Sequence, residues 1–271
     1  MAEITAKLVN ELRGKTGLGM MECKKALVET DGDVDKAIDA FRKKGVKTSI
    51  TERAATEGRV TILVAPDRKR GVMLEINCNT DFTAKSDIVA KIADEAAAKL
   101  LKDPTAKLAE DATIKADLVS VAQQTGENVQ IGRTVVLESK DGLIGSYLYT
   151  VAGKGKIGVL IAATGKADEE TLRHISMHIV AARPLALHRH EVSPELIAKE
   201  KEIAIEQAKA SGKPQNIAEK IAEGKMNSFY AERVLLDQEF INGEVHKGSV
   251  SSLLKNRETT VETYARLEVG H

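Results

Sequence analysis

Residues 58–79 read GRVTILVAPDRKRGVMLEINCN, and their pattern indicates how the central part of the chain folds. Apolar side chains recur there at every second position, first at Val60, Ile62 and Val64 and then at Val72, Leu74, Ile76 and Cys78. A period of two is typical of a strand, and the intervening PDRKRG is rich in turn-forming residues. The stretch therefore predicts a β-hairpin in which Cys78 faces the core as a buried structural thiol.

A helix is expected to follow the hairpin. Ser86 is a suitable N-cap, and apolar residues then recur at helical spacing at Ile88, Ile92, Ala96 and Leu100. The stretch RTVVLES, residues 133–139, is expected to add a third strand to the hairpin. Strands and helices that occur in separate runs in this way indicate an α+β fold.

The same plan returns about 80 residues further on in the chain. Residues 142–165, GLIGSYLYTVAGKGKIGVLIAATG, predict two strands around a Gly/Lys turn. A helix over 168–182 follows with Asp168 at its start, and VETYARLEV at 261–269 predicts the closing strand. The core is therefore expected to hold two related hairpin-plus-helix subdomains.

Three short helices are predicted before the core. They cover residues 4–13, with Thr5 as a cap and Gly14 as a stop, residues 20–29, and a segment capped by Asp33 that ends at Gly45. Residues 46–57 are polar and are interpreted as a linker helix. The loop before the second helix presents Leu18, Met20 and Met21, and their spacing leaves open whether the methionines contact a partner or belong to the core.

Residues 193–226 predict two antiparallel helices. Ser193 and Pro194 form a helix start, and Gly212 followed by Pro214 stops the first helix. The apolar stripe is expected at Leu196, Ile197, Ile203, Ala204 and Ala208 on the first helix and at Ile217, Ile221 and Ala222 on the second. Self-association or partner docking through this hairpin and simple packing on the core both remain open.

Composition excludes several classes of protein. The chain has 271 residues, 40 basic and 40 acidic side chains, and only 3% aromatic residues, so direct binding of nucleic acid is not expected. No apolar run reaches the roughly 18 residues of a membrane span. Two cysteines are too few for a disulfide framework, and the charged start MAEITAKLVNELRGKTG differs from a signal peptide. A cytoplasmic location is therefore expected.

Candidate chemical motifs are weak. The Gly14-Lys15-Thr16 triplet lacks the earlier glycine of a phosphate-binding loop, because Val9 occupies that position. His174 and His178 are four residues apart and could ligate a metal from one helix face, which would make the chain a metal-dependent enzyme. No acidic third ligand accompanies them, so we expect no metal, no cofactor and no enzymatic activity.

The segment that leaves the second strand, residues 77–85, reads NCNTDFTAK. From the residues alone, Thr80 or Asp81 would cap the following helix and Phe82 would pack against it as a hydrophobic staple. Thr83 is expected near solvent, where its hydroxyl has little effect.

Several segments in the right order resemble the bacterial translation elongation factor Ts family over nearly the whole chain. They are TGLGMMECKKAL, LEINCNTDF, IGSY, IGVLIAA and HISMHIVAARP. The resemblance implies a ubiquitin-associated-like helical module with its linker over 1–54 and core subdomain N over 55–140. It further implies core subdomain C over 141–186 and 227–271, interrupted by a protruding helical hairpin over 187–226.

The resemblance also implies a function. Members of this family are guanine-nucleotide exchange factors that bind the GDP form of elongation factor Tu and promote GDP release during translation elongation. The segment Thr80, Asp81, Phe82 and Thr83 is similar to the Thr-Asp-Phe-Val signature, whose Asp and Phe enter the partner and displace its magnesium. Residues implied to bind the partner are Met20, Met21, Lys24, His174 and His178, although for the two histidines a packing role in the second subdomain stays open. A helical adaptor without exchange activity is the alternative.

Two departures from the family pattern are present. Tyr149 stands where some members carry a histidine that contacts the partner, so the resemblance does not imply that contact for this chain. Members also often continue past the last core strand into a further helical module, whereas this sequence ends at His271. The contact made by that module is therefore expected to be missing.

Overall fold

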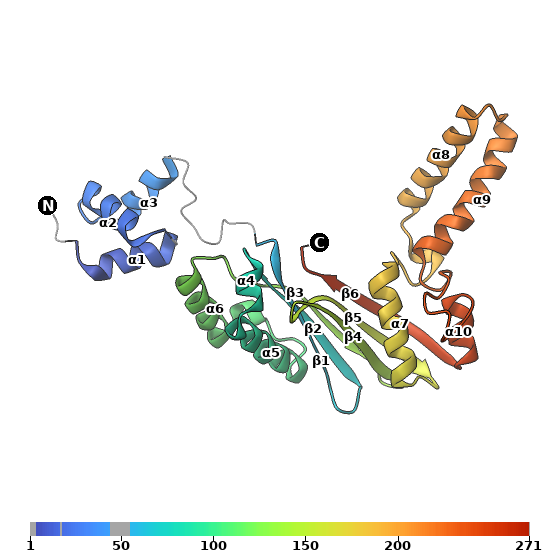
Figure 1. Cartoon of the computed structure of the whole chain (residues 1–271), viewed down its shortest axis with the longest axis horizontal. Helices are drawn as coiled ribbons and strands as arrows, with labels where there is room; N and C mark the ends of the chain where they lie inside the picture. Colours follow the sequence, from blue (N-terminus) through green and yellow to red (C-terminus); the bar gives the residue numbers. More distant parts are fainter. Residues whose placement is uncertain (1–3, 17, 44–54, 271) are drawn as a thin grey trace.

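The structure of the chain is a computed structural model that describes residues 4–16, 18–43 and 55–270 (Figure 1). The first part is a module of three helices: α1 (Ala6–Thr16), α2 (Met20–Glu29) and α3 (Val34–Lys43). Thr5 and Asp33 cap their helices as predicted, because their side chains accept the backbone N–H groups of Leu8 and Lys36 at 3.3 and 3.0 Å. Gly14 does not stop α1, which continues to Thr16.

The predicted linker helix over 46–57 lies mostly outside the described residues. Its last residue, Glu57, already belongs to the first strand, so at that position the helix prediction is wrong. Gly45, the predicted end of the third helix, also lies outside the described part of the chain.

The first core unit is a three-stranded antiparallel sheet covered by helices. The strands are β1 (Glu57–Val64), β2 (Arg70–Cys78) and β3 (Gln130–Glu138), with β2 in the centre. The helices are α4 (Asp81–Lys85), α5 (Asp87–Lys102), the 3₁₀ turn η2 (Leu108–Glu110) and α6 (Ala112–Thr125). The predicted hairpin is confirmed, because Val64 pairs with Gly71 across the turn.

Two details of this unit differ from the prediction. Ser86 caps α5 as expected, but Ile88 is exposed, and the buried face of α5 is carried instead by Val89 and Ala93 together with Ile92, Ala96 and Leu100. The helix α6 was not predicted, although Asp111 caps it and Ile114 and Leu118 are buried at helical spacing.

The second unit repeats the plan of the first. Its strands are β4 (Leu143–Val151), β5 (Lys154–Gly165) and β6 (Thr259–Glu268), with β5 in the centre. Its helices are α7 (Glu169–Ala182), the 3₁₀ turn η3 (Arg189–Glu191) and α10 (Val250–Asn256). Asp168 caps α7 as predicted, through a hydrogen bond of 2.8 Å from the Thr171 N–H. The α+β fold with two related units is therefore confirmed.

The two sheets pack against each other, with helices on both outer faces (Figure 1). Alternation sends the apolar residues of β1 toward the second sheet, where Val60 lies in a cluster with Met73, Leu160 and Ala162. The corresponding residues of β2 point the other way, so that Val72, Leu74, Ile76 and Cys78 pack against α5 and α6. Strand β2 is therefore buried on both faces, a feature that the period-two pattern did not reveal.

The helical hairpin consists of α8 (Pro194–Ala210) and α9 (Gln215–Arg233), and it extends away from the sheets (Figure 1). Ser193 caps α8, and Gly212 adopts a left-handed conformation at its end, as predicted. The second helix continues to Arg233, beyond the predicted end at 226. Four alanines form the seam between the helices: Ala204, Ala208, Ala218 and Ala222. Ile203 and Ile217 are exposed, contrary to their assignment to the apolar stripe.

None of the helices in the described part of the chain is both long and apolar enough to cross a membrane.

Candidate functional site

The loop that connects β2 to α5 forms the candidate site. Thr80 has an extended backbone, and its hydroxyl accepts the Thr83 N–H at 3.4 Å, so Thr80 is the N-cap of the short helix α4. Asp81 is therefore the first helical residue rather than the cap. Ser86 ends α4 and begins α5, so the two helices meet without a connecting loop.

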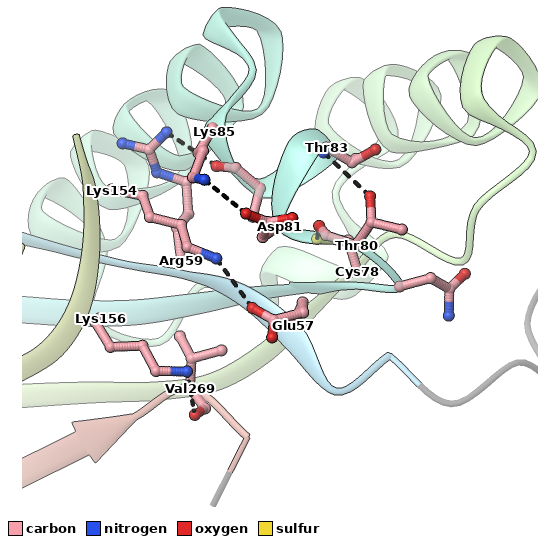
Figure 2. A network of polar contacts seen from close by, with 12 residues as sticks. Glu57, Arg59, Cys78, Thr80, Asp81, Thr83, Lys85, Lys154, Lys156 and Val269 are labelled. Atoms are coloured by element: carbon pink, nitrogen blue, oxygen red, sulfur yellow. Dashed lines mark hydrogen bonds and ion pairs between the residues drawn. The ribbon is translucent and has the colours of Figure 1, made fainter. Parts of the chain in front are cut away.

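Asp81 and Phe82 occupy the tip of this loop. The Phe82 side chain is exposed, with 82% of the residue surface accessible, so the predicted hydrophobic staple is wrong. The Asp81 carboxylate forms an ion pair of 2.6 Å with Lys85, one helical turn along (Figure 2). The hydrogen bond from Lys85 lowers the pKa of the Asp81 carboxyl, and the positive charge of Lys154 adds to this effect. Asp81 therefore carries a negative charge at neutral pH.

Glu127, which follows α6, holds the loop and was missed from the sequence. One carboxylate oxygen accepts hydrogen bonds from the hydroxyls of Thr80 and Thr83, at 2.7 and 2.8 Å. The other accepts the backbone N–H groups of Asn79 and Thr80 at 3.2 and 3.0 Å. Thr83 is only 5% exposed, so its predicted position near solvent is wrong, and its buried hydroxyl is satisfied by Glu127. The sequence offers no signal for this contact, because an acidic residue directly after the glycine that ends a helix is too common to indicate that it holds a distant loop.

Charged side chains lie beneath the loop, where the two sheets meet. Lys154, at the start of β5, is 4% exposed and binds Glu57 of β1 at 3.0 Å (Figure 2). Cys78 is buried as predicted, and its thiol donates to the Thr80 carbonyl oxygen at 3.1 Å. Burial raises the pKa of the Cys78 thiol to about 11, so the thiol stays protonated at neutral pH.

The helix α2 carries a second group of predicted residues. Met20 and Met21 are 53% and 75% exposed, and Lys24 is also exposed on this face. The alternative that placed both methionines in the core is therefore wrong. Leu18 differs from them, because it is buried in the core of the three-helix module.

The two predicted histidines on α7 differ in how far they are buried. His178 is fully buried in the free chain, so of the two roles expected for it, interface and packing, its position favours packing. Its Nδ1 accepts the Ile241 N–H at 3.3 Å, which leaves the proton on Nε2 to donate to the Gln238 Oε1 at 2.9 Å. Burial lowers the pKa of His178 below its usual value. Both ring nitrogens are occupied, and therefore His178 is not available as a metal ligand.

His174 is partly exposed and lines an open pocket of about 400 Å³ together with Met177, Ile241 and Asn242. Among the residues that the structure describes, no three His, Cys, Asp or Glu side chains are grouped as metal ligands. Figure 1 shows α4 beside the first sheet and α7 beside the second, so the structure does not bring the histidines to the Thr80–Thr83 loop.

Comparison with known proteins identifies the family. A family model described as "Elongation factor TS" matches residues 79–271. Elongation factor Ts of Methylococcus capsulatus is 41% identical over 280 aligned residues, which cover 98% of this chain and 92% of that protein. The proteins of the same name from Vibrio vulnificus and Yersinia pestis are 40% and 41% identical, with 98% and 100% of this chain covered and 92% and 93% of theirs. This chain belongs to the elongation factor Ts family.

The family match begins at Asn79 and therefore contains the whole Thr80–Thr83 loop, together with Glu127. It also contains the second sheet and the helical hairpin, whereas α1 to α3 precede it. The alignments with the elongation factor Ts relatives extend the likeness over these helices, because they cover nearly the full chain. The family expected from the sequence motifs is thus confirmed.

Proposed function

We propose that this chain is a guanine-nucleotide exchange factor for elongation factor Tu. It binds the GDP form of that partner and promotes GDP release during translation elongation. Membership of the elongation factor Ts family supports this function. The observation that carries it is the 82% exposure of Phe82 at the tip of a loop whose two ends are hydrogen-bonded. Burial of such an aromatic ring in a partner is worth about 1.5–3 kcal/mol.

Exchange requires that the factor bind the nucleotide-free partner more tightly than the GDP-bound partner. Because coupling between two ligands is reciprocal, factor binding then weakens GDP binding by the same ratio. A protein without catalytic residues accelerates release in this way, since it supplies binding free energy that replaces the lost nucleotide contacts.

The Thr80–Thr83 loop supplies the part of this binding that acts on the nucleotide site. Phe82 inserts into the nucleotide-binding domain of the partner, and the adjacent charge of Asp81 disturbs the coordination of its magnesium ion. Lys85 lies within the same surface, because its ammonium group pairs with Asp81 at 2.6 Å. The loss of magnesium then weakens the phosphate contacts of GDP.

Two further surfaces hold the partner. The exposed face of α2 contributes Met20, Met21 and Lys24, and α7 contributes His174 beside its open pocket. Methionine side chains adapt to an irregular partner surface at small cost in strain. These surfaces contribute to affinity, whereas Asp81 and Phe82 determine how fast GDP is released.

The decisive experiment measures the release of fluorescent GDP from elongation factor Tu with and without this chain. We expect the wild-type chain to accelerate release and Phe82→Ala to reduce the acceleration about tenfold or more, as for an interface hot spot. The substitution should change the free energy of unfolding by less than about 0.5 kcal/mol, because Phe82 is exposed. Val119→Ala, at another exposed apolar residue, is the control and should leave release unchanged.

The exposed methionines of α2 favour one competing function, a helical adaptor without exchange activity. An adaptor would bind its targets through the three-helix module alone and leave the GDP release rate unchanged. Removal of residues 1–53 distinguishes the two functions. An exchange factor that lacks them should bind nucleotide-free elongation factor Tu more weakly but still accelerate release at high concentration.

A further inference from the structure

Glu127 joins the two ends of the loop that carries Asp81 and Phe82. Four donors surround its carboxylate: two hydroxyls, from Thr80 and Thr83, at 2.7 and 2.8 Å, and two backbone N–H groups, from Thr80 and Asn79, at 3.0 and 3.2 Å. The hydrogen bonds span 44 to 48 residues of sequence. One side chain therefore connects the end of β2 and the first turn of α4 to the end of α6.

The chemistry of this arrangement favours a carboxylate over a neutral side chain. Two backbone N–H groups face one of its oxygens and two hydroxyls face the other, and an ionised carboxylate accepts hydrogen bonds from all four. Hydrogen bonds to a charged group are also stronger than those between neutral groups. A glutamine whose oxygen faces the two N–H groups would turn its NH₂ group toward the two hydroxyls, which would then have to accept instead of donate. The bonds to a charged acceptor would be lost, so glutamine keeps only part of the interactions.

The backbone of Glu127 is itself fixed. Gly126 has a φ of +70° and ends α6 through a hydrogen bond from its N–H to the Ala122 carbonyl at 2.8 Å. The Glu127 N–H donates to the Thr125 hydroxyl at 3.2 Å, and the Asn128 N–H donates to the Asn79 side chain at 2.7 Å. The carboxylate is thus presented from a rigid support rather than from a free surface side chain.

The residues that Glu127 holds flank the tip of the loop. Thr80 and Thr83 are anchored, and the two residues between them, Asp81 and Phe82, remain accessible. A loop that already has its bound shape pays less conformational entropy when it enters a partner. We propose that Glu127 is a positioning residue for nucleotide exchange, which holds Asp81 and Phe82 in the geometry that displaces the nucleotide. This inference rests on the proposed function.

The role predicts a specific kinetic signature. A loosened loop places Phe82 correctly for only a fraction of the time, so the maximal rate of GDP release should fall. The affinity for elongation factor Tu should change much less, because the α2 face and the second unit bind independently of the loop. Loss of a residue that merely stabilised the fold would lower the amount of active protein. It would not lower the maximal rate of GDP release while leaving the affinity for elongation factor Tu nearly unchanged.

The experiment compares Glu127→Ala and Glu127→Gln with the wild-type full chain. We expect Glu127→Ala to lower the maximal rate of GDP release about tenfold, because all four acceptor interactions are removed. Glu127→Gln should lie between Glu127→Ala and wild type. Gln124→Ala is the matched control, since it removes an exposed polar side chain from the last turn of the same helix α6. It should leave the rate unchanged.

A double-mutant cycle tests whether Glu127 acts through the loop tip. If it does, Glu127→Ala should have much less effect in the Phe82→Ala background than in the wild-type background. An equal fold-change in both backgrounds would overturn the positioning role. So would a wild-type rate in Glu127→Ala while Phe82→Ala is impaired.

Amide hydrogen exchange provides a readout that does not depend on activity. The N–H groups of Asn79 and Thr80 should exchange faster in Glu127→Ala than in wild type or Gln124→Ala, because Glu127 is their acceptor. Unchanged exchange at both amides would show that Glu127 does not hold the loop. If the wild-type chain itself fails to release GDP, the proposed function is overturned, and the amide measurement still decides whether the loop is held.

Discussion

Asp81 and Phe82 are adjacent in the chain, but their side chains have different surroundings in the free protein. Phe82 is exposed and carries a ring that water solvates poorly, so it gains free energy on burial in a partner. Asp81 already has a cationic neighbour, because Lys85 binds its carboxylate at 2.6 Å. The Asp81 carboxylate therefore meets a partner in one of two states. Either it is still paired with Lys85, or the ion pair has first been broken.

The substitution Asp81→Asn separates the charge of this residue from its size. Thr80 rather than Asp81 caps α4, so the change should have little effect on folding. We expect slower GDP release at saturating magnesium and a smaller loss when magnesium is scarce, because low magnesium already weakens GDP binding. The measurement is the release rate at two magnesium concentrations, with circular dichroism as a control for folding. Equal rates for both proteins at both concentrations would leave Phe82 and the wider interface as the source of exchange.

At the scale of an element, α7 is fixed by a buried polar contact as well as by apolar packing. His178 on this helix contacts the segment after α9, through Gln238 and the backbone of Ile241. Its ring also stacks on Phe240, with 5.5 Å between the ring centroids. Gln238 is held in turn, because its amide donates to the carbonyls of Glu232 and Ala182. The arrangement requires a neutral histidine, since Nδ1 must accept a hydrogen bond.

The docking of α7 should therefore depend on pH. Burial lowers the pKa of His178 in the folded chain, so between that pKa and about 6.5 the unfolded chain binds more protons. The contribution of His178 to the free energy of unfolding should consequently be constant above this range and fall as the pH drops through it. We expect a steeper fall in wild type than in His178→Gln, measured by urea unfolding between neutral and mildly acidic pH. His190→Gln, at an exposed histidine, should keep the wild-type dependence, and a wild-type slope in His178→Gln would contradict the assignment.

In the whole molecule, the two units are joined by the contact between their sheets. The backbones of β1 and β5 approach closely at Gly155, where an added Cβ would collide with the Val60 carbonyl oxygen. Lys154, the preceding residue, binds Glu57 across the same boundary at 3.0 Å. A glycine is required here by the short distance between the strands.

Gly155→Ala should therefore destabilise the chain by about 1–3 kcal/mol, because the strands must separate to accommodate the methyl group. Gly224→Ala is the matched control: this glycine lies within α9, and an added Cβ would meet no atom within 4 Å. The control should stabilise the chain by up to about 1 kcal/mol, which is the difference in helix propensity. Thermal and urea unfolding of both variants measure the effects, and equal stability of the two would contradict the close approach.

The local elements of the chain can be predicted from the amino-acid sequence. Both hairpins follow from period-two alternation around turn residues, and the caps Thr5, Asp33, Ser86 and Asp168 were correct. These features depend on interactions between residues close in sequence, which a short segment contains in full. The signal for α6 is local as well, since Asp111 precedes Ile114 and Leu118 at helical spacing. The motifs further sufficed to indicate the family.

Which surface covers each of these elements depends on the tertiary structure. Alternation cannot tell that β1 packs on the second sheet while β2 packs on helices, because both partners are apolar. Whether Phe82 packs or projects, and whether His178 is buried, depends likewise on segments distant in sequence. The clearest case is Glu127, whose carboxylate meets the Thr83 hydroxyl across 44 residues. Such a contact carries no local pattern, since it arises only when the folded chain brings the end of α6 beside the end of β2.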